Sequence, residues 1–251
     1  MGAPQQLLVS GLVVIPGNSG ILTSGSIFTL PATSGARINV LAIGGGGGGG
    51  GGSARTYASG YYTGGGSGGA GGNAYALNVS VQPGSNIVYT ISPGAGGGGV
   101  RDGIFTSGSN GSNAATYAAV GVGSTNILTV TGGMGGIVSP SGTGGANGTA
   151  VTGTQLLAPT YGNNAAADTI GGLGAKGYQI NTTVGASLAS ILTYGSTGTA
   201  GPENSGQFPT SGTIYGAGGT GGGCSQSDVY NYNNTASSSG TTGAVFIWWG
   251  Y

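Results

Sequence analysis

Apolar and polar residues alternate in several short segments of the chain. Every second residue is apolar between Leu77 and Gln82, and the same alternation returns between Ile87 and Ser92. A period of two is typical of a strand with one buried face. Because the turn-forming pair Pro83-Gly84 separates the two runs, they predict a β-hairpin. Comparable runs, rich in β-branched and aromatic residues, cover residues 7–15, 21–30, 37–43, 127–131 and 244–249.

No segment of comparable length shows the helical period of 3.6 residues. Only residues 187–192 form a short apolar run that could make one or two helical turns. We therefore predict an all-β fold. Within it, Tyr75 and Tyr89 are expected to face a sheet core, and residues 245–249 are expected to form a last, central strand.

Glycine separates these predicted strands in blocks. The chain contains 63 glycines among 251 residues. A flexible, solvated linker is the simplest interpretation of one such block, but strand-like sequence between the blocks argues against it. The blocks cover residues 44–52, where glycine is unbroken, and residues 64–72, 94–99, 132–136, 142–148, 171–177 and 216–223.

Ordered glycine blocks can form polyglycine-II helices. Such a helix has about three residues per turn and no internal hydrogen bonds, so its amides must bond sideways to neighbouring helices. At a rise of about 3.1 Å per residue, the block at residues 44–52 would span roughly 28 Å. We expect parallel and antiparallel helices of this kind beside a β-sandwich, with Gly47 and Gly48 too crowded to accept Val. Collagen is excluded because proline is scarce within the blocks and their spacing is irregular.

Charge is almost absent from the chain. There are 4 basic and 4 acidic residues, and the net charge is zero. Nucleic acid and anionic lipid partners need a basic face, which four scattered cations cannot build. No apolar run is long enough to span a bilayer, so we expect no membrane insertion. The single cysteine, Cys224, excludes an intrachain disulfide and a cysteine-based metal cluster.

The residues that enzymes use most are also scarce. The chain has no histidine, and its carboxylates, Asp102, Asp168, Glu203 and Asp228, are dispersed. The sequence therefore shows no local arrangement that would activate a nucleophile or pair two carboxylates for catalysis. The block at residues 171–177 does not match a phosphate-binding loop, since it lacks the required glycine before Lys176 and the Ser or Thr after it. We predict a protein that is not an enzyme, with no catalytic residues, no cofactor and no metal.

Several motifs follow one another in a distinctive order along the chain. The first is Ser26-Ile27-Phe28-Thr29-Leu30-Pro31, and residues 38–43 then run into Gly44. The order continues through residues 68–73, 75–81, 83–84, 89–92, 94–99, 128–133 and 243–249. This order resembles that of glycine-rich bacteriophage tail-fibre and adhesin proteins. In the T-even-like distal adhesins, polyglycine-II helices form a sandwich from which variable loops bind a bacterial surface receptor. The resemblance thus implies an all-β fold of this type and a place on the exterior of a virion.

This resemblance also implies a division of the chain and a set of partners. Residues 1–25 would be an N-terminal strand or attachment segment, and residues 26–251 the glycine-rich β and polyglycine-II domain. The partners would be a host cell-surface protein or glycan and other virion fibre or tail proteins. A homotrimer is one option, because fibre shafts are commonly trimeric, whereas an adhesin tip can be a single chain.

On this interpretation, the candidate receptor contacts lie between glycine blocks. Tyrosine among Ser, Gly and Asn suits binding, because Tyr offers a large amphipathic surface at low entropic cost. Each of these tyrosines could instead cover the edge of the glycine array. The candidates are Arg55, Tyr57, Tyr61 and Tyr62 after the first block, Tyr161, Asn163 and Asn164 before Gly171, and Tyr230, Tyr232 and Asn233 after Gly223.

Two functions of different class follow from the sequence. The first is a phage fibre protein or adhesin that binds a host receptor through loops between glycine blocks. The second is a purely structural virion component, such as a decoration, collar or fibre-shaft protein, in which the glycine array provides stiffness. A non-viral glycine-rich structural or ice-binding protein is a third alternative, although an ice binder should present a regular repeat on a flat face.

Overall fold

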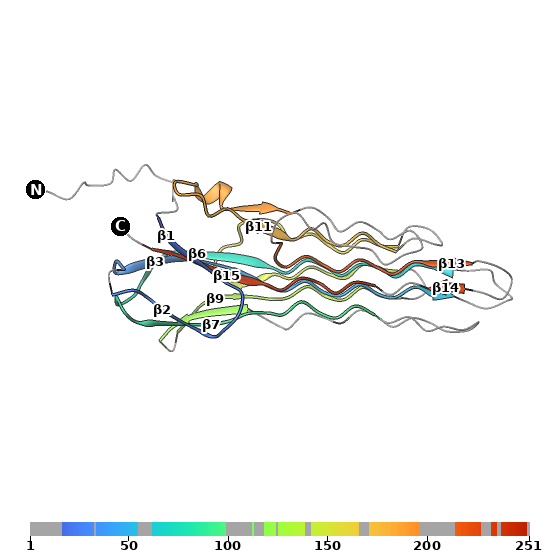
Figure 1. Cartoon of the computed structure of the whole chain (residues 1–251), viewed down its shortest axis with the longest axis horizontal. Coiled ribbons are helices and arrows are strands. Elements are labelled where there is room, and N and C mark those ends of the chain that lie inside the picture. Colours follow the sequence, from blue (N-terminus) through green and yellow to red (C-terminus); the bar gives the residue numbers. More distant parts are fainter. Residues whose placement is uncertain are drawn as a thin grey trace, which may run out of the picture.

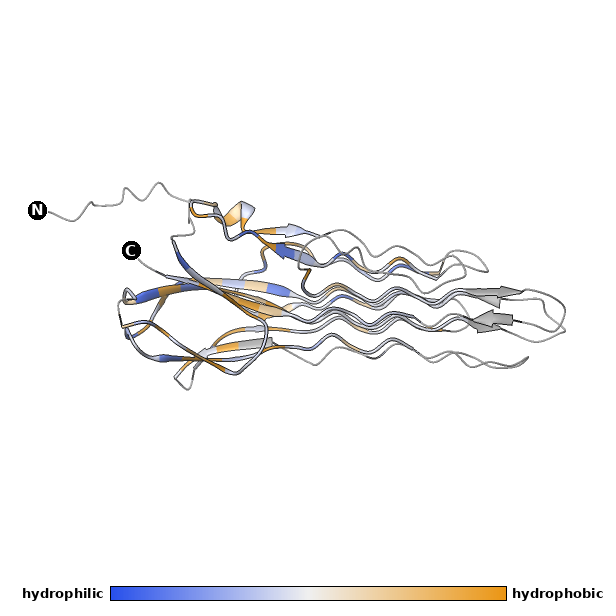
Figure 2. Cartoon of the chain, in the orientation of Figure 1, coloured by the Kyte–Doolittle hydropathy of each residue, from blue (hydrophilic) through white to orange (hydrophobic). Residues whose placement is uncertain are grey.

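The computed structural model has a β-sandwich at one end and a long array of glycine segments at the other (Figure 1). It describes residues 17–32, 34–54, 62–98, 112, 118–123, 125–138, 142–165, 171–195, 214–226, 232–234 and 237–249. Apolar residues are concentrated in the sandwich, and the array is mostly of neutral hydropathy (Figure 2). The all-β prediction is confirmed.

Two antiparallel sheets form the sandwich. The four-stranded sheet has the order β1-β15-β3-β6, and the five-stranded sheet has the order β10-β9-β8-β7-β2. The first contains β1 (Asn18–Leu22), β15 (Ala244–Trp249), β3 (Arg37–Ile43) and β6 (Asn73–Ser80). The second contains β10 (Ala150–Thr152), β9 (Thr125–Val130), β8 (Ala118–Val122), β7 (Asn86–Thr90) and β2 (Ile27–Thr29).

The four-stranded sheet is buried on both faces at its centre. Val40 and Ile247 face the five-stranded sheet, where Tyr89 also lies in the core. Phe246 and Trp248 face a second core under the hairpin of β11 (Tyr178–Ile180) and β12 (Leu192–Tyr194). Burial on both faces explains why β3 and β15 have continuous apolar runs in place of alternation. The predicted last, central strand is confirmed as β15.

The predicted hairpin at residues 77–92 is wrong. Its turn is present, with Gly84 at a φ of 77°. However, β6 pairs with β3, whereas β7 pairs with β2 and β8 in the other sheet. The turn therefore carries the chain across the sandwich. A period of two reports that a strand has a buried face but does not report which strand it pairs with.

Other predicted elements differ in detail. Residues 21–30 are divided between β1 and β2, because the chain changes sheets near Gly25, which has a φ of 91°. Strand β1, within the predicted segment 1–25, is hydrogen-bonded to β15. The apolar run at residues 187–192 contains a single turn of 3₁₀ helix, η1 (Leu188–Ser190). The predicted strand at residues 7–15 lies outside the described residues.

The glycine segments are hydrogen-bonded sideways, as polyglycine-II helices require. Gly44, Gly47 and Gly50 donate their amides to the carbonyls of Gly72, Gly69 and Gly66 at 2.8–2.9 Å. The partner numbers decrease by the same steps of three, so segments 44–52 and 64–72 are antiparallel. Segment 131–138 instead runs parallel to 44–52, because Gly133 and Gly136 donate to Gly45 and Gly48. The predicted mixture of parallel and antiparallel helices is confirmed.

Glycine is required in this array because neighbouring backbones occupy the space of a side chain. A Cβ on Gly44 or Gly47 would meet segment 131–138, and a Cβ on Gly45 or Gly48 would meet segment 93–98. A Cβ on Gly46 would meet the carbonyl of Ala217. Because the neighbour changes with each residue and returns after three, segment 44–52 has about three residues per turn.

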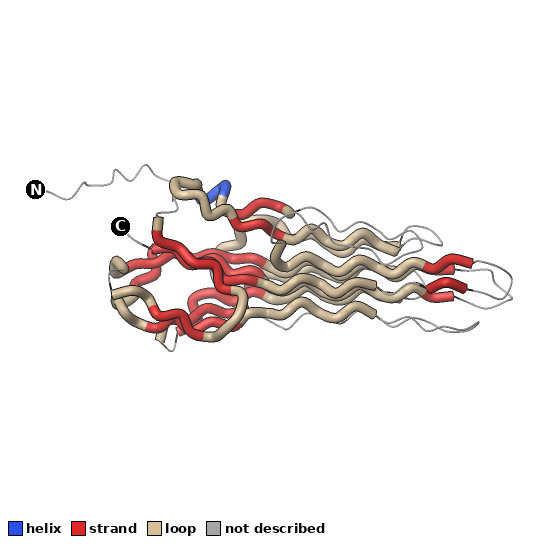
Figure 3. The backbone as a smooth tube through the Cα atoms, in the orientation of Figure 1, coloured by secondary structure: helices blue, strands red, loops and turns tan. Residues whose placement is uncertain are grey.

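The array extends the sandwich outward. Segments 44–52, 64–72 and 237–243 adjoin strands of the four-stranded sheet, whereas 93–98, 131–138 and 142–149 extend from the five-stranded sheet (Figure 3). Segments 158–165, 171–177 and 216–223 are also each hydrogen-bonded to 64–72. Segments 44–52 and 64–72 are therefore enclosed, and all their residues are buried.

Long side chains occupy outward positions in two of the outer helices. Met134 and Ile137 are exposed three residues apart in one segment, and Leu173 and Lys176 are exposed three residues apart in another. The sequences Gly-Gly-Met-Gly-Gly-Ile and Gly-Gly-Leu-Gly-Ala-Lys follow this period. The spacing of the blocks, predicted to be irregular, therefore contains a local period of three that places one residue per turn in solvent.

Tyr178 joins the β11–β12 hairpin to the array. Its hydroxyl donates a hydrogen bond to the carbonyl of Gly71 at 3.0 Å, and its side chain is fully buried. Burial raises the pKa of Tyr178 far above the usual value for tyrosine, and Tyr194 raises it further, while a hydrogen bond with Asn73 opposes the shift. The phenol is therefore held neutral in the folded protein.

A first prediction compares two glycines that face each other. In Gly48→Ala, the new methyl group would overlap the carbonyl oxygen of Gly96, whereas in Gly96→Ala it would meet nothing within 4 Å. We expect Gly48→Ala to lower the free energy of unfolding by several kcal/mol. Gly96→Ala should change it by less than about 1 kcal/mol. Denaturant unfolding measures both, and equal effects would contradict the burial of segment 44–52.

A second prediction concerns Tyr178→Phe. At neutral pH, loss of the hydrogen bond to Gly71 should lower the free energy of unfolding by about 1 kcal/mol. Since the folded pKa of Tyr178 is raised, its contribution is complete below the unfolded pKa of about 10 and declines as pH rises above that value. The variant should therefore lose less stability than the native protein in alkali. Unfolding curves measured at neutral and alkaline pH test this expectation, with Tyr161→Phe, an exposed site, as the control.

Equal alkaline destabilisation of the native protein and Tyr178→Phe would contradict the assignment to Tyr178. Burial also raises the pKa of Tyr215. This residue therefore contributes to alkaline destabilisation in the same direction, and part of the effect should remain in the variant.

Candidate functional site

Two short hairpins lie at the end of the array farthest from the sandwich (Figures 1 and 3). Strands β4 (Ser53–Ala54) and β5 (Tyr62–Thr63) pair with each other, as do β13 (Cys224–Gln226) and β14 (Tyr232–Asn234). Strand β13 contacts β5, and β14 contacts β4. The two hairpins therefore form one group, which we call the distal end.

The array positions these hairpins directly. Strand β4 follows segment 44–52, and β5 precedes segment 64–72, so this hairpin joins the two enclosed helices. Strand β13 follows segment 216–223, which is hydrogen-bonded to both of these helices. Each hairpin thus begins where a glycine segment ends, and that segment is hydrogen-bonded to its neighbours. Loops held by a rigid scaffold are a common location for binding residues.

The distal end contains the described members of two of the three predicted groups of receptor contacts. The backbones of Tyr62, Tyr232 and Asn233 lie in β5 and β14. These positions are separated by about 170 residues in the sequence, and the antiparallel path of the array brings them to the same end. The other members of the two groups, Arg55, Tyr57, Tyr61 and Tyr230, lie outside the described residues.

The third predicted group lies along the flank of the array. Asn163 donates a side-chain hydrogen bond to the carbonyl of Leu173 at 2.8 Å, and its backbone amide donates to the hydroxyl of Ser67 at 2.6 Å. Asn164 accepts from the amide of Gly144 at 2.9 Å. Both amide side chains thus link segment 158–165 to its neighbours. Tyr161, at 70% exposure, projects into solvent.

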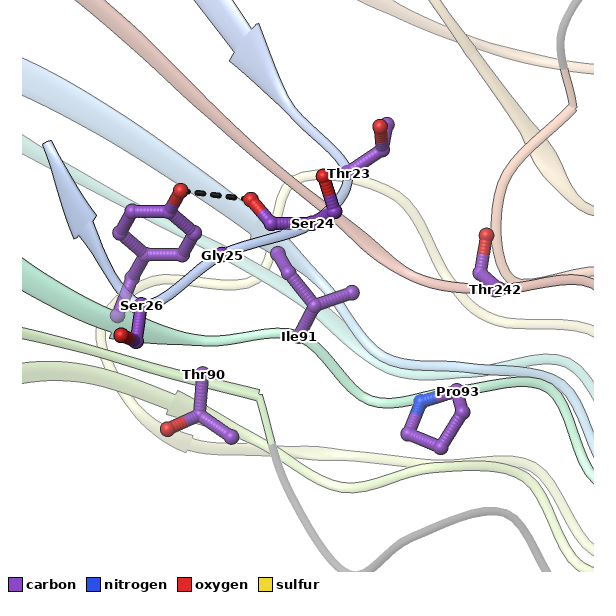
Figure 4. Close-up of a pocket in the computed structure, with 9 residues that line it drawn as sticks. Thr23, Ser24, Gly25, Ser26, Thr90, Ile91, Pro93 and Thr242 are labelled. Atoms are coloured by element: carbon purple, nitrogen blue, oxygen red, sulfur yellow. Dashed lines mark hydrogen bonds between the residues drawn. The ribbon is translucent and has the colours of Figure 1, made fainter.

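Two concave surfaces at the sandwich end were not anticipated from the sequence. The first, of about 380 Å³, lies between the β1–β2 connection and the start of segment 93–98 (Figure 4). Tyr89 donates a hydrogen bond to the carbonyl of Ser24 at 2.7 Å, which holds one wall in place. A Cβ on Gly25 would lie 2.8 Å from that phenol oxygen, so the close approach requires glycine. Its lining residues are Thr23, Ser24, Gly25, Ser26, Tyr89, Thr90, Ile91, Pro93 and Thr242.

The second concave surface, of about 490 Å³, lies beside the β11–β12 hairpin. It combines amide and hydroxyl side chains with apolar ones, and its lining residues are Ile21, Gln179, Ile180, Asn181, Thr182, Thr193 and Tyr215. Sequence reasoning could not find it, since its residues come from three separate regions of the chain. None of them belongs to a motif.

Charged side chains are few among the described residues. Arg37 and Lys176 are the charged residues among them, and both are exposed. Within the same part of the chain, no group of three or more His, Cys, Asp or Glu side chains could hold a metal ion. The described residues also include no helix long and apolar enough to cross a membrane.

Comparison with models of known protein families gives no match, and no curated protein is significantly similar to the chain.

A third prediction tests the structural role of the Asn163 side chain. Replacing Asn163 by Ala removes its bond to Leu173 and should lower the free energy of unfolding by about 1 kcal/mol. Gln155→Ala, at an exposed amide, should leave it unchanged within about 0.5 kcal/mol. Thermal or denaturant unfolding of the two variants measures the difference. If Asn163→Ala behaves like Gln155→Ala, its bond to Leu173 does not stabilise the array.

Proposed function

We propose that this protein is a receptor-binding adhesin or fibre protein on the exterior of a phage virion, and that the distal end contacts the host bacterium. The observation that carries the proposal is the position of the two hairpins. They lie side by side at the end opposite the sandwich, and the first of them joins the two enclosed helices of the array. In the sandwich, the first described strand pairs with the last, as in the pair between Asn18 and Trp249. Such a molecule is suited to holding a surface away from its point of connection to a particle.

The array supports this function through its stiffness. Between segments 44–52 and 64–72, lateral hydrogen bonds recur at every third residue. Bending these helices would require adjacent helices to slide and several such bonds to lengthen together. The distal end is therefore displaced from the sandwich without a flexible linker. The same stiffness would serve a purely structural virion component, and the experiment below is designed to separate the two functions.

The expected ligand is a host surface protein or glycan recognised without strong electrostatic steering. The backbones of Tyr62 and Tyr232 lie in the distal hairpins, and the chain as a whole has no net charge. Binding should therefore depend on apolar contact, stacking on sugar or protein faces and neutral hydrogen bonds. Exposed charge pairs contribute only about 0–1 kcal/mol and are screened over about 8 Å at physiological salt.

A fourth prediction tests the distal end against the flank. The double variants Tyr61→Ala with Tyr62→Ala, and Tyr230→Ala with Tyr232→Ala, should each weaken host-cell binding by about 2 kcal/mol or more. Tyr161→Ala removes an equally large but flank-exposed side chain and should have little effect. Binding of labelled protein to host cells at low and high salt measures these effects, with melting temperatures recorded for every variant.

The outcomes distinguish the possible binding surfaces. Loss of binding in Tyr161→Ala alone would place the contact on the flank. Binding that collapses in high salt but is unchanged in both double variants would contradict both the distal assignment and the neutral chemistry. Complete absence of binding to host cells that the phage infects would favour the purely structural function.

A further inference from the structure

The second concave surface, beside the β11–β12 hairpin, has the volume of a small-molecule site, and we call it the cleft. Its volume of about 490 Å³ falls within the range of about 300–1,000 Å³ that is usual for ligand pockets. One wall is Ile21 on the edge strand β1, and another is formed by Gln179 to Thr182 at the end of β11. Tyr215 and Thr193 complete the lining.

Several polar groups of this cleft are available to a ligand. The side chains of Gln179, Thr182 and Thr193 make no hydrogen bond within the described part of the chain. Asn181 accepts from the amide of Thr183 at 3.0 Å through its side-chain oxygen, so its NH₂ group remains a donor. The cleft therefore offers free donors and free acceptors together.

The arrangement is also held in place before any ligand binds. Gln179 and Thr193 are directly opposite each other in the antiparallel register, so their side chains emerge on the same side of the hairpin. Tyr178, adjacent to Gln179, is buried and bonded to the array, and the Tyr215 backbone exchanges two hydrogen bonds with Tyr178. A ligand would therefore meet polar groups on a fixed backbone, which lowers the entropic cost of binding.

The apolar part of the lining narrows the ligand class further. Ile21 and Ile180 are half-buried, and Tyr215 is 7% exposed, so the cleft has an apolar portion beside its amides and hydroxyls. Among the residues that the structure describes, no charged residue lines it. A charged ligand would lose hydration without gaining an ionic partner. A ligand with both C–H faces and many hydroxyl groups would match both kinds of surface.

We propose that this cleft binds a neutral saccharide, with Gln179, Asn181, Thr182 and Thr193 as its hydrogen-bonding residues and Ile21, Ile180 and Tyr215 as its apolar contacts. The site is distinct from the distal end, because β1 and β11 lie towards the sandwich end of the molecule (Figure 1). It does not depend on the proposed adhesin function. Sugar binding here and receptor binding at the distal end can succeed or fail separately.

The test uses the full chain and four neutral sugars: glucose, galactose, N-acetylglucosamine and maltose. Each is titrated into isotope-labelled protein to millimolar concentrations, and the side-chain amide signals of Gln179 and Asn181 are followed by NMR. At least one sugar should shift these signals in a saturable manner. Gln179→Ala and Thr193→Val should each weaken that binding by about tenfold. Gln155→Ala, which removes an exposed amide outside the cleft, should leave the affinity unchanged.

Other outcomes would overturn the proposal. If none of the four sugars shifts the two amide signals, the cleft is not a saccharide site for these ring types. If affinity is the same in Gln179→Ala, Thr193→Val and the native protein, the sugar binds elsewhere. Tighter binding of glucuronate than of glucose would contradict the neutral character of the site. Thr193→Val is nearly isosteric, so it tests the hydroxyl even if Gln179→Ala fails to fold.

Discussion

The lateral hydrogen bond between polyglycine-II helices is the interaction on which the rest of the molecule depends. A polyglycine-II helix satisfies none of its amides internally, so a buried one is stable only when neighbouring carbonyls are within reach. That distance leaves no room for a side chain, since a Cβ on most array glycines would collide with a neighbouring backbone. The glycine content of the chain is thus a packing requirement. Its entropic cost is offset collectively, because each enclosed helix bonds to several neighbours.

The sandwich and the array stabilise each other through continuous chain segments. Strand β3 becomes segment 44–52, and segment 64–72 becomes β6. The sheet fixes the position of these two segments relative to each other along their axes. The pairing of Ile43 with Asn73 at the end of the strands continues as the hydrogen bond from Gly44 to Gly72. Glycine helices have no side chains with which to select one register from several. Side-chain packing in the two apolar cores therefore provides the selection.

The sequence predicts local elements better than their partners. Alternation and apolar runs locate β3, β6, β7 and β15, because burial acts directly on side chains. The same pattern could not show that β6 and β7 belong to different sheets, since a turn across a sandwich uses the same Pro83-Gly84 pair as a hairpin. Glycine blocks indicated laterally bonded helices, yet the positions of these helices relative to one another depend on backbone contacts without a side-chain signature. For the same reason the cleft beside β11, assembled from three regions, had no sequence signal.

The period of three in the outer helices has a consequence for how such a chain can change in length. Leu173 and Lys176 are exposed, whereas the residues between them, Gly174 and Ala175, are buried. Deleting one residue from this segment would turn Lys176 by about a third of a turn, towards the buried positions that now hold only Gly and Ala. Three residues can be gained or lost with the phase preserved. Length variation in an array of this kind should therefore occur in triplets of amino acids, whereas the connections at its ends are free of that rule.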